Sequence, residues 1–448
     1  MYFRIPARTC PNVPRSLMSQ PLRIACLMFA GASLVACGDS ARLMANEDTG
    51  ASPRIVAPNE SLIPTLKIAP AVGWPDDALP IAADGWTVTA FARDLSHPRW
   101  VYVLPNGDVL VAESNAPPGK SGISGLKGAI MGSVMKKAGA GTPSADRITL
   151  LRDADRDGVA ELRSVLLEGL HSPFGMALVD GMLYVANADA LVRVPYSTGD
   201  IRIDTTPVKV ADLPGKADEL NHHWTKSLVA SADGTRLYVG VGSNSNVGEN
   251  GMAVEAGRAA VWEFDVRNGI GRVFASGLRN TVGLAWQPAS GALWAVVNER
   301  DELGSDLVPD YLTEVREGAF YGWPYSYYGR TDSRAPAPPG GAAVPSATRP
   351  DYALGSHVAP LGLAFDTHGA YVGLHGSWNR KPLNGYKVVF VPFSDGRPAG
   401  AMRDVLSGFL DDDGNARGRP AGVAIDARGG LMVADDAGNA VWRVAATR

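Results

Sequence analysis

One pattern, a β-hairpin, recurs six times along the chain and constrains its fold more than any other feature. Each copy has a Pro or Gly, an alternating apolar strand, a Gly-containing turn and a second β-rich strand. Turns such as Asn-Gly and Asp-Gly supply the positive φ that tight hairpins need. The copies read PRWVYVLPNGDVLVAE from Pro98, SPFGMALVDGMLYVAN from Ser172, KSLVASADGTRLYVGVG from Lys226, TVGLAWQPASGALWAVVNE from Thr281, APLGLAFDTHGAYVGLHG from Ala359 and RPAGVAIDARGGLMVADD from Arg419.

The spacing of these hairpins predicts an all-β, six-bladed β-propeller with four-stranded antiparallel blades. The copies start roughly fifty to eighty residues apart, which leaves room for further strands and variable loops. A third strand follows several of them, as in ALVRVPY, AAVWEFDV, YKVVFVPF and NAVWRVAA. The alternative is a β-sandwich with accidental similarity between hairpins, whereas a doubly wound dinucleotide-binding fold is excluded because long helical periodicity is absent.

The first 36 residues have the pattern of an export signal. They contain four arginines and no acidic residue, then a short apolar run over 24–30. Leu34-Val35-Ala36-Cys37 resembles a bacterial lipobox, which predicts cleavage before Cys37, lipidation of its thiol and a periplasmic, membrane-anchored protein. An ordinary secretory signal is the alternative, and Met18 could be the true start.

Cysteine content and charge narrow the function further. All three cysteines, Cys10, Cys26 and Cys37, stand at or before the proposed cut, so the mature 412 residues offer no disulfide, Cys-based zinc site or C-x-x-C-H haem attachment. Removal of the four arginines takes the net charge from −4 to −8. This acidic balance argues against nucleic acid as a partner. We expect a tether over 37–80, the propeller over 81–448, and surface loops over 116–145 and 329–350.

Three segments next to hairpins contain more polar residues than a strand edge requires. His222 and His223 precede the third hairpin, where one imidazole facing the channel could act as a general base. Arg279 and Asn280 precede the fourth and offer donors to a carboxylate or quinone oxygen. Oxygen-rich residues over 298–306 follow it and suit a hard cation such as Ca²⁺. Surface histidines, an Arg bridging two blades and a solvated acidic loop are the structural alternatives.

A separate Asp-rich segment, Asp153-Ala154-Asp155-Arg156-Asp157-Gly158, matches the start of a Ca²⁺-binding loop. The twelfth position is Ser164 where an EF-hand has Glu, so the EF-hand pattern fails. A structural Ca²⁺ clip and a plain Asp-rich turn both remain open for this segment.

Several longer motifs together resemble the sorbosone dehydrogenase family, which is related to soluble pyrroloquinoline quinone (PQQ) glucose dehydrogenases. They cover most of residues 85–445. The resemblance implies a six-bladed propeller with PQQ and Ca²⁺ at the channel mouth. The motifs are HHWTKSLVASADGTRLYVGVGSNSN, GLRNTVGLAW, NERDELGSDLVPDYLTEV, YGWPYSYYG, HGSWNRKPLNGYKVVFV and RPAGVAIDARGGLMVADDAGNAVWRV.

The same resemblance implies roles for individual residues. His223 matches the general base, and Arg279 and Asn280 match a pair that contacts the quinone oxygens. Arg419 matches an Arg that binds a cofactor carboxylate. Arg380 stands where the relatives have a Lys with a similar role in binding the cofactor. Asp301 and Glu302 align with the Gly-Pro pair whose backbone carbonyls hold Ca²⁺ in the relatives, and Ala421 stands where they have a second cofactor-binding Arg.

The resemblance therefore predicts an oxidoreductase that oxidises a sugar or sugar-derived aldehyde, with PQQ and Ca²⁺ as cofactors. His223 would take the hydroxyl proton while hydride passes to PQQ. Electrons would leave to a separate quinone or cytochrome, because this chain has no haem motif. The alternatives are a propeller lipoprotein that binds a carbohydrate or envelope partner without turnover, and a Ca²⁺-dependent lactonase.

Overall fold

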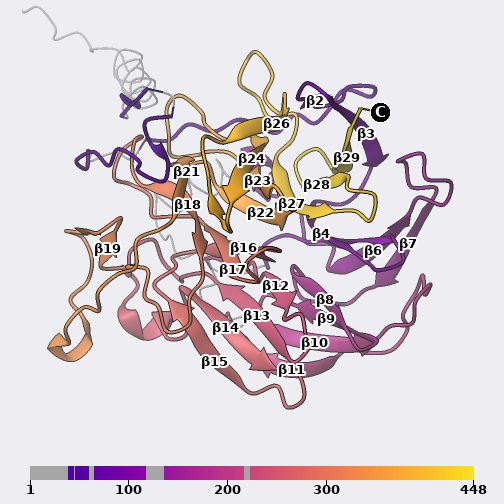
Figure 1. Ribbon diagram of the computed structural model, residues 1–448, viewed down its shortest axis with the longest axis horizontal. Coiled ribbons are helices and arrows are strands. Elements are labelled where there is room, and N and C mark those ends of the chain that lie inside the picture. The colour runs from indigo at the N-terminus through magenta and orange to yellow at the C-terminus, as the bar shows by residue number, and fades with distance from the viewer. Residues whose placement is uncertain (1–38, 45, 60–64, 118–135, 216–221, 448) are drawn as a thin grey trace, which may run out of the picture. The chain divides into compact units, whose positions relative to one another are not determined.

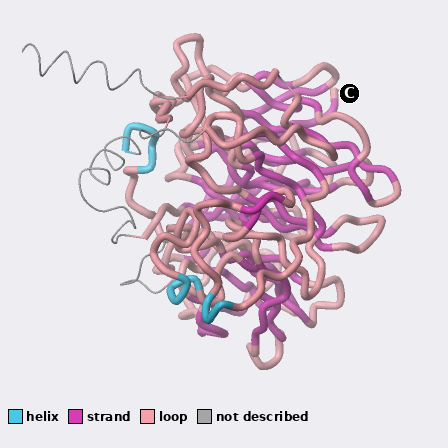
Figure 2. Tube along the Cα trace, turned by 90° about the vertical axis from the view of Figure 1, so that its left-hand side faces the viewer, coloured by secondary structure: helices cyan, strands magenta, loops and turns pink. Residues whose placement is uncertain are grey.

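The computed structural model describes residues 39–44, 46–59, 65–117, 136–215 and 222–447. Residues Asp39–Arg448 form one compact unit. The predicted signal segment and Cys37 lie outside the described residues. Helical structure in the described ranges is limited to short turns (Figure 2), namely η1 (Lys136–Ala140), η2 (Met252–Glu255) and η3 (Pro339–Gly341). None of these turns could cross a membrane.

Six antiparallel sheets confirm the predicted propeller, and Figure 1 shows them following one another around a common centre. Each begins with one of the six hairpins and continues outward with a third and a fourth strand. The first three blades are β4 (Pro98–Val103), β5 (Val109–Glu113), β6 (Arg147–Arg152) and β7 (Leu162–Leu167); β8 (Met176–Val179), β9 (Met182–Ala186), β10 (Ala190–Pro195) and β11 (Val208–Asp212); and β12 (Leu228–Ala230), β13 (Arg236–Val241), β14 (Ala260–Asp265) and β15 (Gly271–Ser276).

The last three blades recruit strands from the N-terminal part of the chain. Blade 6 is completed by β3, which pairs with the C-terminal β29 and thereby closes the ring. These blades are β16 (Thr281–Trp286), β17 (Leu293–Val297), β18 (Pro309–Glu314), β21 (Tyr352–Ser356) and β1 (Thr49–Gly50); β22 (Pro360–Phe365), β23 (Gly369–Leu374), β24 (Lys387–Ser394), β26 (Arg403–Ser407) and β2 (Ile81–Ala82), with β25 (Arg397–Pro398) beside β24; and β27 (Pro420–Ile425), β28 (Leu431–Asp435), β29 (Ala440–Ala446) and β3 (Trp86–Ala92). A separate hairpin joins β19 (Ser326–Tyr327) to β20 (Arg330–Thr331).

Glycines at the inner strand of four of the six blades let neighbouring blades pack backbone to backbone. A Cβ on Gly175 would lie 2.3 Å from the backbone nitrogen of Leu228 in the next blade. A Cβ on Gly362 would lie 2.4 Å from the carbonyl oxygen of Ala421, again one blade further on. No side chain fits at such distances, so the Gly shared by the motifs SPFG, TVG, PLG and PAG is a packing requirement.

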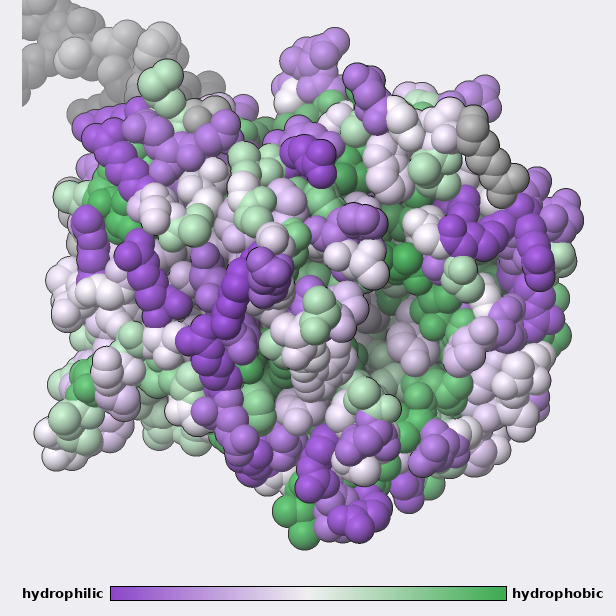
Figure 3. All heavy atoms as spheres, viewed as in Figure 1, coloured by the Kyte–Doolittle hydropathy of each residue, from purple (hydrophilic) through white to green (hydrophobic). Residues whose placement is uncertain are grey.

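Burial follows the order of the strands in each blade. The inner strands β16, β22 and β27 are almost fully buried. The outer strands β7, β11 and β15 each contain exposed residues. A strand covered on both faces needs continuous apolar residues, and an outer strand does not. Figure 3 accordingly shows many hydrophilic residues toward the edge of the ring.

The predicted tether over 37–80 differs from what the structure shows for its described residues. The main-chain N–H of Arg42 donates to Asp306, β1 adds to blade 4, and Ala69 is fully buried. The reason is backbone pairing: a two-residue strand satisfies its hydrogen bonds with a sheet edge while leaving almost no pattern in the sequence. The predicted loop over 329–350 is also partly anchored, because Asp332 is buried in an ion pair with Arg300.

Candidate active site at the polar end of the propeller

Polar side chains gather at the end of the ring where each inner strand begins and its hairpin partner ends. We call this the polar end. Antiparallel pairing brings these two kinds of chain end together in every blade. Buried polar residues from several blades lie there, and they are His97, Asn115, Asn187, Ser243, Arg279, Asn280, Glu299, His357, Arg419 and Asp436.

His223 has a defined proton arrangement at this end. Its Nδ1 lies 2.8 Å from the main-chain oxygen of Ser243, and a carbonyl oxygen can only accept a hydrogen bond. In the neutral ring Nδ1 therefore carries the proton and Nε2 carries the lone pair. Burial, together with His222 and Arg279, holds the pKa of His223 well below its usual range. The ring is thus neutral at pH 7, with Nε2 able to accept a proton.

Lys226 supports the segment that carries His223. Its Nζ donates to the main-chain oxygen of Trp224 at 3.0 Å and to that of His223 at 3.3 Å. The side chain is fully buried, and this burial lowers the pKa of Lys226 to about 7. One buried amine therefore fixes two consecutive carbonyls next to the imidazole.

His222 is held differently from its neighbour. Its side chain is exposed, and its ring meets that of His223 edge to face at 4.6 Å. The contact with Ser243 distinguishes His223 as the oriented imidazole of the pair.

Arg279 is buried and bonded to the protein itself. It donates to the main-chain and side-chain oxygens of Asn246 at 3.2 and 3.0 Å, to the main-chain oxygen of Glu299, and to Asp301 at 3.2 Å. The neighbouring Asn280 differs, because its Oδ1 is buried without a hydrogen-bond partner among the described residues. The structure thus assigns Arg279 a bridging role between blades 3 and 4, and its contact with a quinone stays a prediction.

Asp301 and Glu302, the predicted metal ligands, point to separate cationic partners. Asp301 lies between Arg279 and His357, whose Nδ1 is 3.2 Å from Oδ1. Although burial favours the neutral acid, the hydrogen bond from His357 and the charge of Arg279 lower the pKa of Asp301. Glu302 reaches Arg334 at 3.6 Å. Ion-paired carboxylates are poor ligands for Ca²⁺, so the side chains of Asp301 and Glu302 offer it little, and the metal site at these residues stays a prediction.

Arg380 and Arg419 lie on backbone carbonyls of neighbouring segments. Arg380 donates to the main-chain oxygen of Ser305, and Arg419 to that of Ala69 at 3.1 Å. The guanidinium of Arg419 also stacks on the ring of Tyr386 at 4.8 Å. The Nε atoms of both arginines are buried without a hydrogen-bond partner in the described part of the chain.

A second polar cluster joins blades 1, 5 and 6, and the sequence interpretation missed it. Asp436 accepts hydrogen bonds from Arg99 and from Nε2 of His375, the latter at 2.8 Å, with His97 at 3.9 Å. Burial lowers the pKa of His375 to about 4. Arg99 also stacks on Trp224, next to His223, at 5.7 Å. The position of these residues in the sequence could have indicated the cluster, because each stands at or beside an end of a hairpin, as His223 does.

The fold and this end define a six-bladed propeller with histidines and arginines gathered from most of its blades. A family model described as TrAA12-like matches residues 144–317 and 343–447, which is more than half of the chain. The chain belongs to the TrAA12-like family.

Two sequence relatives and one solved structure are similar to this chain. An uncharacterized protein of Borreliella burgdorferi is 28% identical over 302 residues, or 61% of this chain and 76% of that protein. A pyrroloquinoline quinone-dependent pyranose dehydrogenase of Coprinopsis cinerea is 29% identical over 218 residues, 38% of this chain but only 30% of that protein. The holo form of the pyranose dehydrogenase PQQ domain from Coprinopsis cinerea superposes with a TM-score of 0.64 at 20% identity, covering 84% of this chain and all of that domain.

Proposed function

We propose that this protein is a PQQ-dependent oxidoreductase that oxidises a sugar or a sugar-derived aldehyde, with His223 as the general base. The family membership and the pyranose dehydrogenase relative support the cofactor and the substrate class. The single observation that carries the base assignment is the hydrogen bond from Nδ1 of His223 to Ser243, which leaves Nε2 free to take a proton. We include sorbosone among the sugar-derived aldehydes that the protein would oxidise.

The polar end fits PQQ better than it fits a mouth Ca²⁺. PQQ is a quinone with three carboxylates, so it needs cations and hydrogen-bond donors. Arg99, Arg380 and Arg419 each keep a buried Nε without a hydrogen-bond partner among the described residues. These arginines would hold the carboxylates, and Asn280 lies next to the His223 segment. The carboxylate of Asp301 is already paired with Arg279 and His357, so it is a poor ligand for Ca²⁺.

The chemistry assigned to the chain is a proton transfer in a fixed geometry. When bound, PQQ supplies the two-electron acceptor for the hydride that leaves the substrate carbon. Nε2 of His223 accepts the hydroxyl proton, so a C–H and an O–H bond break and a C=O bond forms. Ser243 keeps the imidazole oriented, and the hydrogen bonds of Lys226 hold the backbone beneath it. A separate quinone or cytochrome would then receive the electrons.

The test is dye reduction by the purified protein, with an aldose as donor, measured with and without added PQQ. Turnover that requires PQQ supports the proposal. Tight carbohydrate binding without turnover would favour the non-catalytic binding propeller. Lactone hydrolysis without PQQ would favour a lactonase.

We further propose that the protein is exported and anchored through Cys37. The support is the basic, apolar and Leu-Val-Ala-Cys sequence of the first 37 residues. In a bacterial host, the wild-type chain should take up labelled fatty acid and fractionate with membranes. Cys37→Ser should abolish the labelling, and labelling that persists would reject the anchor.

A further inference from the structure

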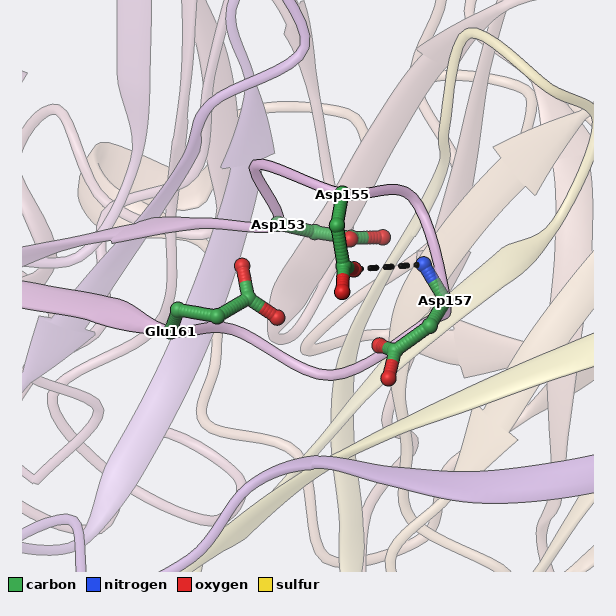
Figure 4. A group of neighbouring side chains, drawn as sticks. All are labelled: Asp153, Asp155, Asp157 and Glu161. Carbon is green, nitrogen blue, oxygen red and sulfur yellow. Dashed lines mark hydrogen bonds between the residues drawn. The ribbon is translucent and has the colours of Figure 1, made fainter.

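Four carboxylates converge in the loop between β6 and β7, at the end of blade 1 opposite the polar end (Figure 4). One oxygen from each of Asp153, Asp155, Asp157 and Glu161 lies within 4.8 Å of all the others. Counting from Asp153, these are positions 1, 3, 5 and 9 of the loop. Glu161 therefore supplies the acidic group that Ser164, at position 12, lacks.

The backbone of this loop holds the carboxylates in place. The N–H groups of Gly158, Asp157 and Val159 donate to Asp153, Asp155 and Asp157 at 3.1, 3.1 and 2.8 Å, and that of Ala154 donates to Glu161 at 2.6 Å. Gly158, at position 6, has φ of 97°, which a residue with a side chain adopts only with strain. The conformation of the turn therefore keeps the four carboxylates close to one another.

One oxygen of this cluster lacks a partner where a partner is needed. The side chain of Asp153 is only 5% exposed, and its Oδ1 is buried without a hydrogen-bond partner among the described residues. Its Oδ2 accepts from Gly158 and from Arg428. A buried, unpartnered carboxylate oxygen is costly. Because this oxygen belongs to a side chain grouped with three more carboxylates, it points to a cation that would satisfy it.

We propose that this loop binds Ca²⁺ and that the ion strengthens the contact between blade 1 and blade 6. We call this contact the seam, because blade 6 contains the strand pair β3–β29 that closes the ring. The donors are carboxylate oxygen atoms, which suit Ca²⁺ better than a metal that prefers nitrogen or sulfur. Besides the bond from Arg428 to Asp153, the loop reaches blade 6 through three further contacts. Thr89 donates to the main-chain oxygen of Gly158 at 3.2 Å, Arg428 donates to that of Arg156 at 2.7 Å, and the N–H of Ala160 donates to Phe91 at 2.9 Å.

The seam matters because Thr89 and Phe91 lie on β3, the N-terminal strand that closes the ring against β29. An ion that orders residues 153–161 would hold blade 1 against this closing strand. The role is structural and independent of the proposed dehydrogenase activity, because the loop and the polar end lie at opposite ends of the blade.

The test uses the full mature chain, stripped of metal with a chelator and kept free of PQQ. Calorimetric titration with Ca²⁺ should show saturable binding. The unfolding temperature should rise with Ca²⁺ concentration, as expected for a ligand of the folded state alone. Hydrogen exchange at the amide of Ala160 should slow by at least about tenfold on Ca²⁺ binding, because that amide bonds across the seam.

The variant Asp155→Asn/Asp157→Asn should lose the Ca²⁺-dependent rise and the slowed exchange, and both side chains belong to exposed residues, so the variant should still fold. The matched control is Asp412→Asn/Asp413→Asn, which removes two exposed carboxylates from another Asp-rich turn and should keep both effects. Equal Ca²⁺ effects in the loop variant, or none in the wild type, would overturn the proposal. Neither result depends on whether PQQ binds.

Discussion

Two acidic segments of this molecule resemble each other in sequence but differ in how their charge is balanced. At the polar end, Asp301 is flanked by Arg279 and His357, and Glu302 by Arg334. In the β6–β7 loop, four carboxylates converge on one ion pair, that of Asp153 with Arg428, and a buried oxygen of Asp153 is left without a hydrogen-bond partner among the described residues. In the first segment each carboxylate has its own cationic partner, whereas in the second the carboxylates outnumber the cation.

This difference teaches that the density of acidic residues does not locate a metal site. A group of carboxylates favours an added cation where protein cations balance only part of its charge. The residues that neutralise Asp301 lie 22 and 56 positions away in sequence. The acidic groups of the loop lie within nine consecutive residues, so their convergence is a local property of the turn.

The largest expected effect separates the catalytic end from the loop. His223→Ala should reduce kcat by about 10²- to 10⁴-fold, the usual contribution of a general base. PQQ binding should persist, because the arginines remain. Steady-state dye reduction, with PQQ binding followed by absorbance, measures both. The matched control is Asp155→Asn/Asp157→Asn, which should keep kcat near the wild-type value with Ca²⁺ present. Near-normal turnover in His223→Ala would transfer the base to His222 or elsewhere.

A second change tests the ion-pair network directly. Asp301→Asn leaves Arg279 and His357 buried without their carboxylate, which should lower the free energy of unfolding by about 3 kcal/mol. Urea unfolding measures this loss. The Ca²⁺-dependent rise in unfolding temperature should remain in this variant. If Asp301→Asn abolishes that rise and the loop variant keeps it, the two segments have been assigned the wrong way round.

Lys226 offers a pH-dependent test of the polar end, away from the β6–β7 loop. Its pKa of about 7 in the folded protein lies below the 10.5 of an unperturbed lysine. Between these values the unfolded chain binds a proton that the folded chain lacks, so this group makes stability rise with pH across the window. The slope from Lys226 should approach about 1.4 kcal/mol per pH unit near pH 9. Lys226→Met should remove that contribution from denaturant unfolding curves, and an unchanged slope would reject the buried amine.

The smallest expected effect concerns the pH profile of turnover. Because the pKa of His223 is held well below its usual range, the base stays unprotonated as the pH falls from 8 to 6.5. Its contribution to kcat/KM should change by less than about twofold over this interval, with the loss appearing only at more acidic pH. A half-maximal rate near pH 6.5 that shifts in His223→Gln would show an unperturbed imidazole.

The fold was largely predictable because each blade begins with the same hairpin pattern, which is local in the sequence. Alternating strands around Gly-containing turns identified all six hairpins, and the third strands followed by the same pattern. The strands β1 and β2 were missed, because each spans only two residues and pairs through its backbone. Closure by β3 was missed as well, since strand pairing across the whole chain leaves no local mark.

The candidate site was predictable only in part. Family resemblance indicated His223, Arg279, Asn280, Arg380 and Arg419 as one site, and the structure places them at the polar end. Their partners could not be foreseen: nothing in the sequence links Arg279 to Asn246, or His375 to Asp436, before the ring is formed. The Asp-rich loop shows the reverse case, where a local motif was visible and only the free oxygen of Asp153 decides between its two interpretations.

The most direct test of the central claim is the absorbance spectrum of PQQ bound to the purified wild-type protein, recorded without oxygen before and after an aldose is added. We expect PQQ to bind and its spectrum to convert to the reduced form when sugar is added. With His223→Ala, PQQ should bind but stay oxidised on the same time scale. Failure of PQQ to bind, or equally fast reduction in wild type and variant, would contradict the proposed dehydrogenase function.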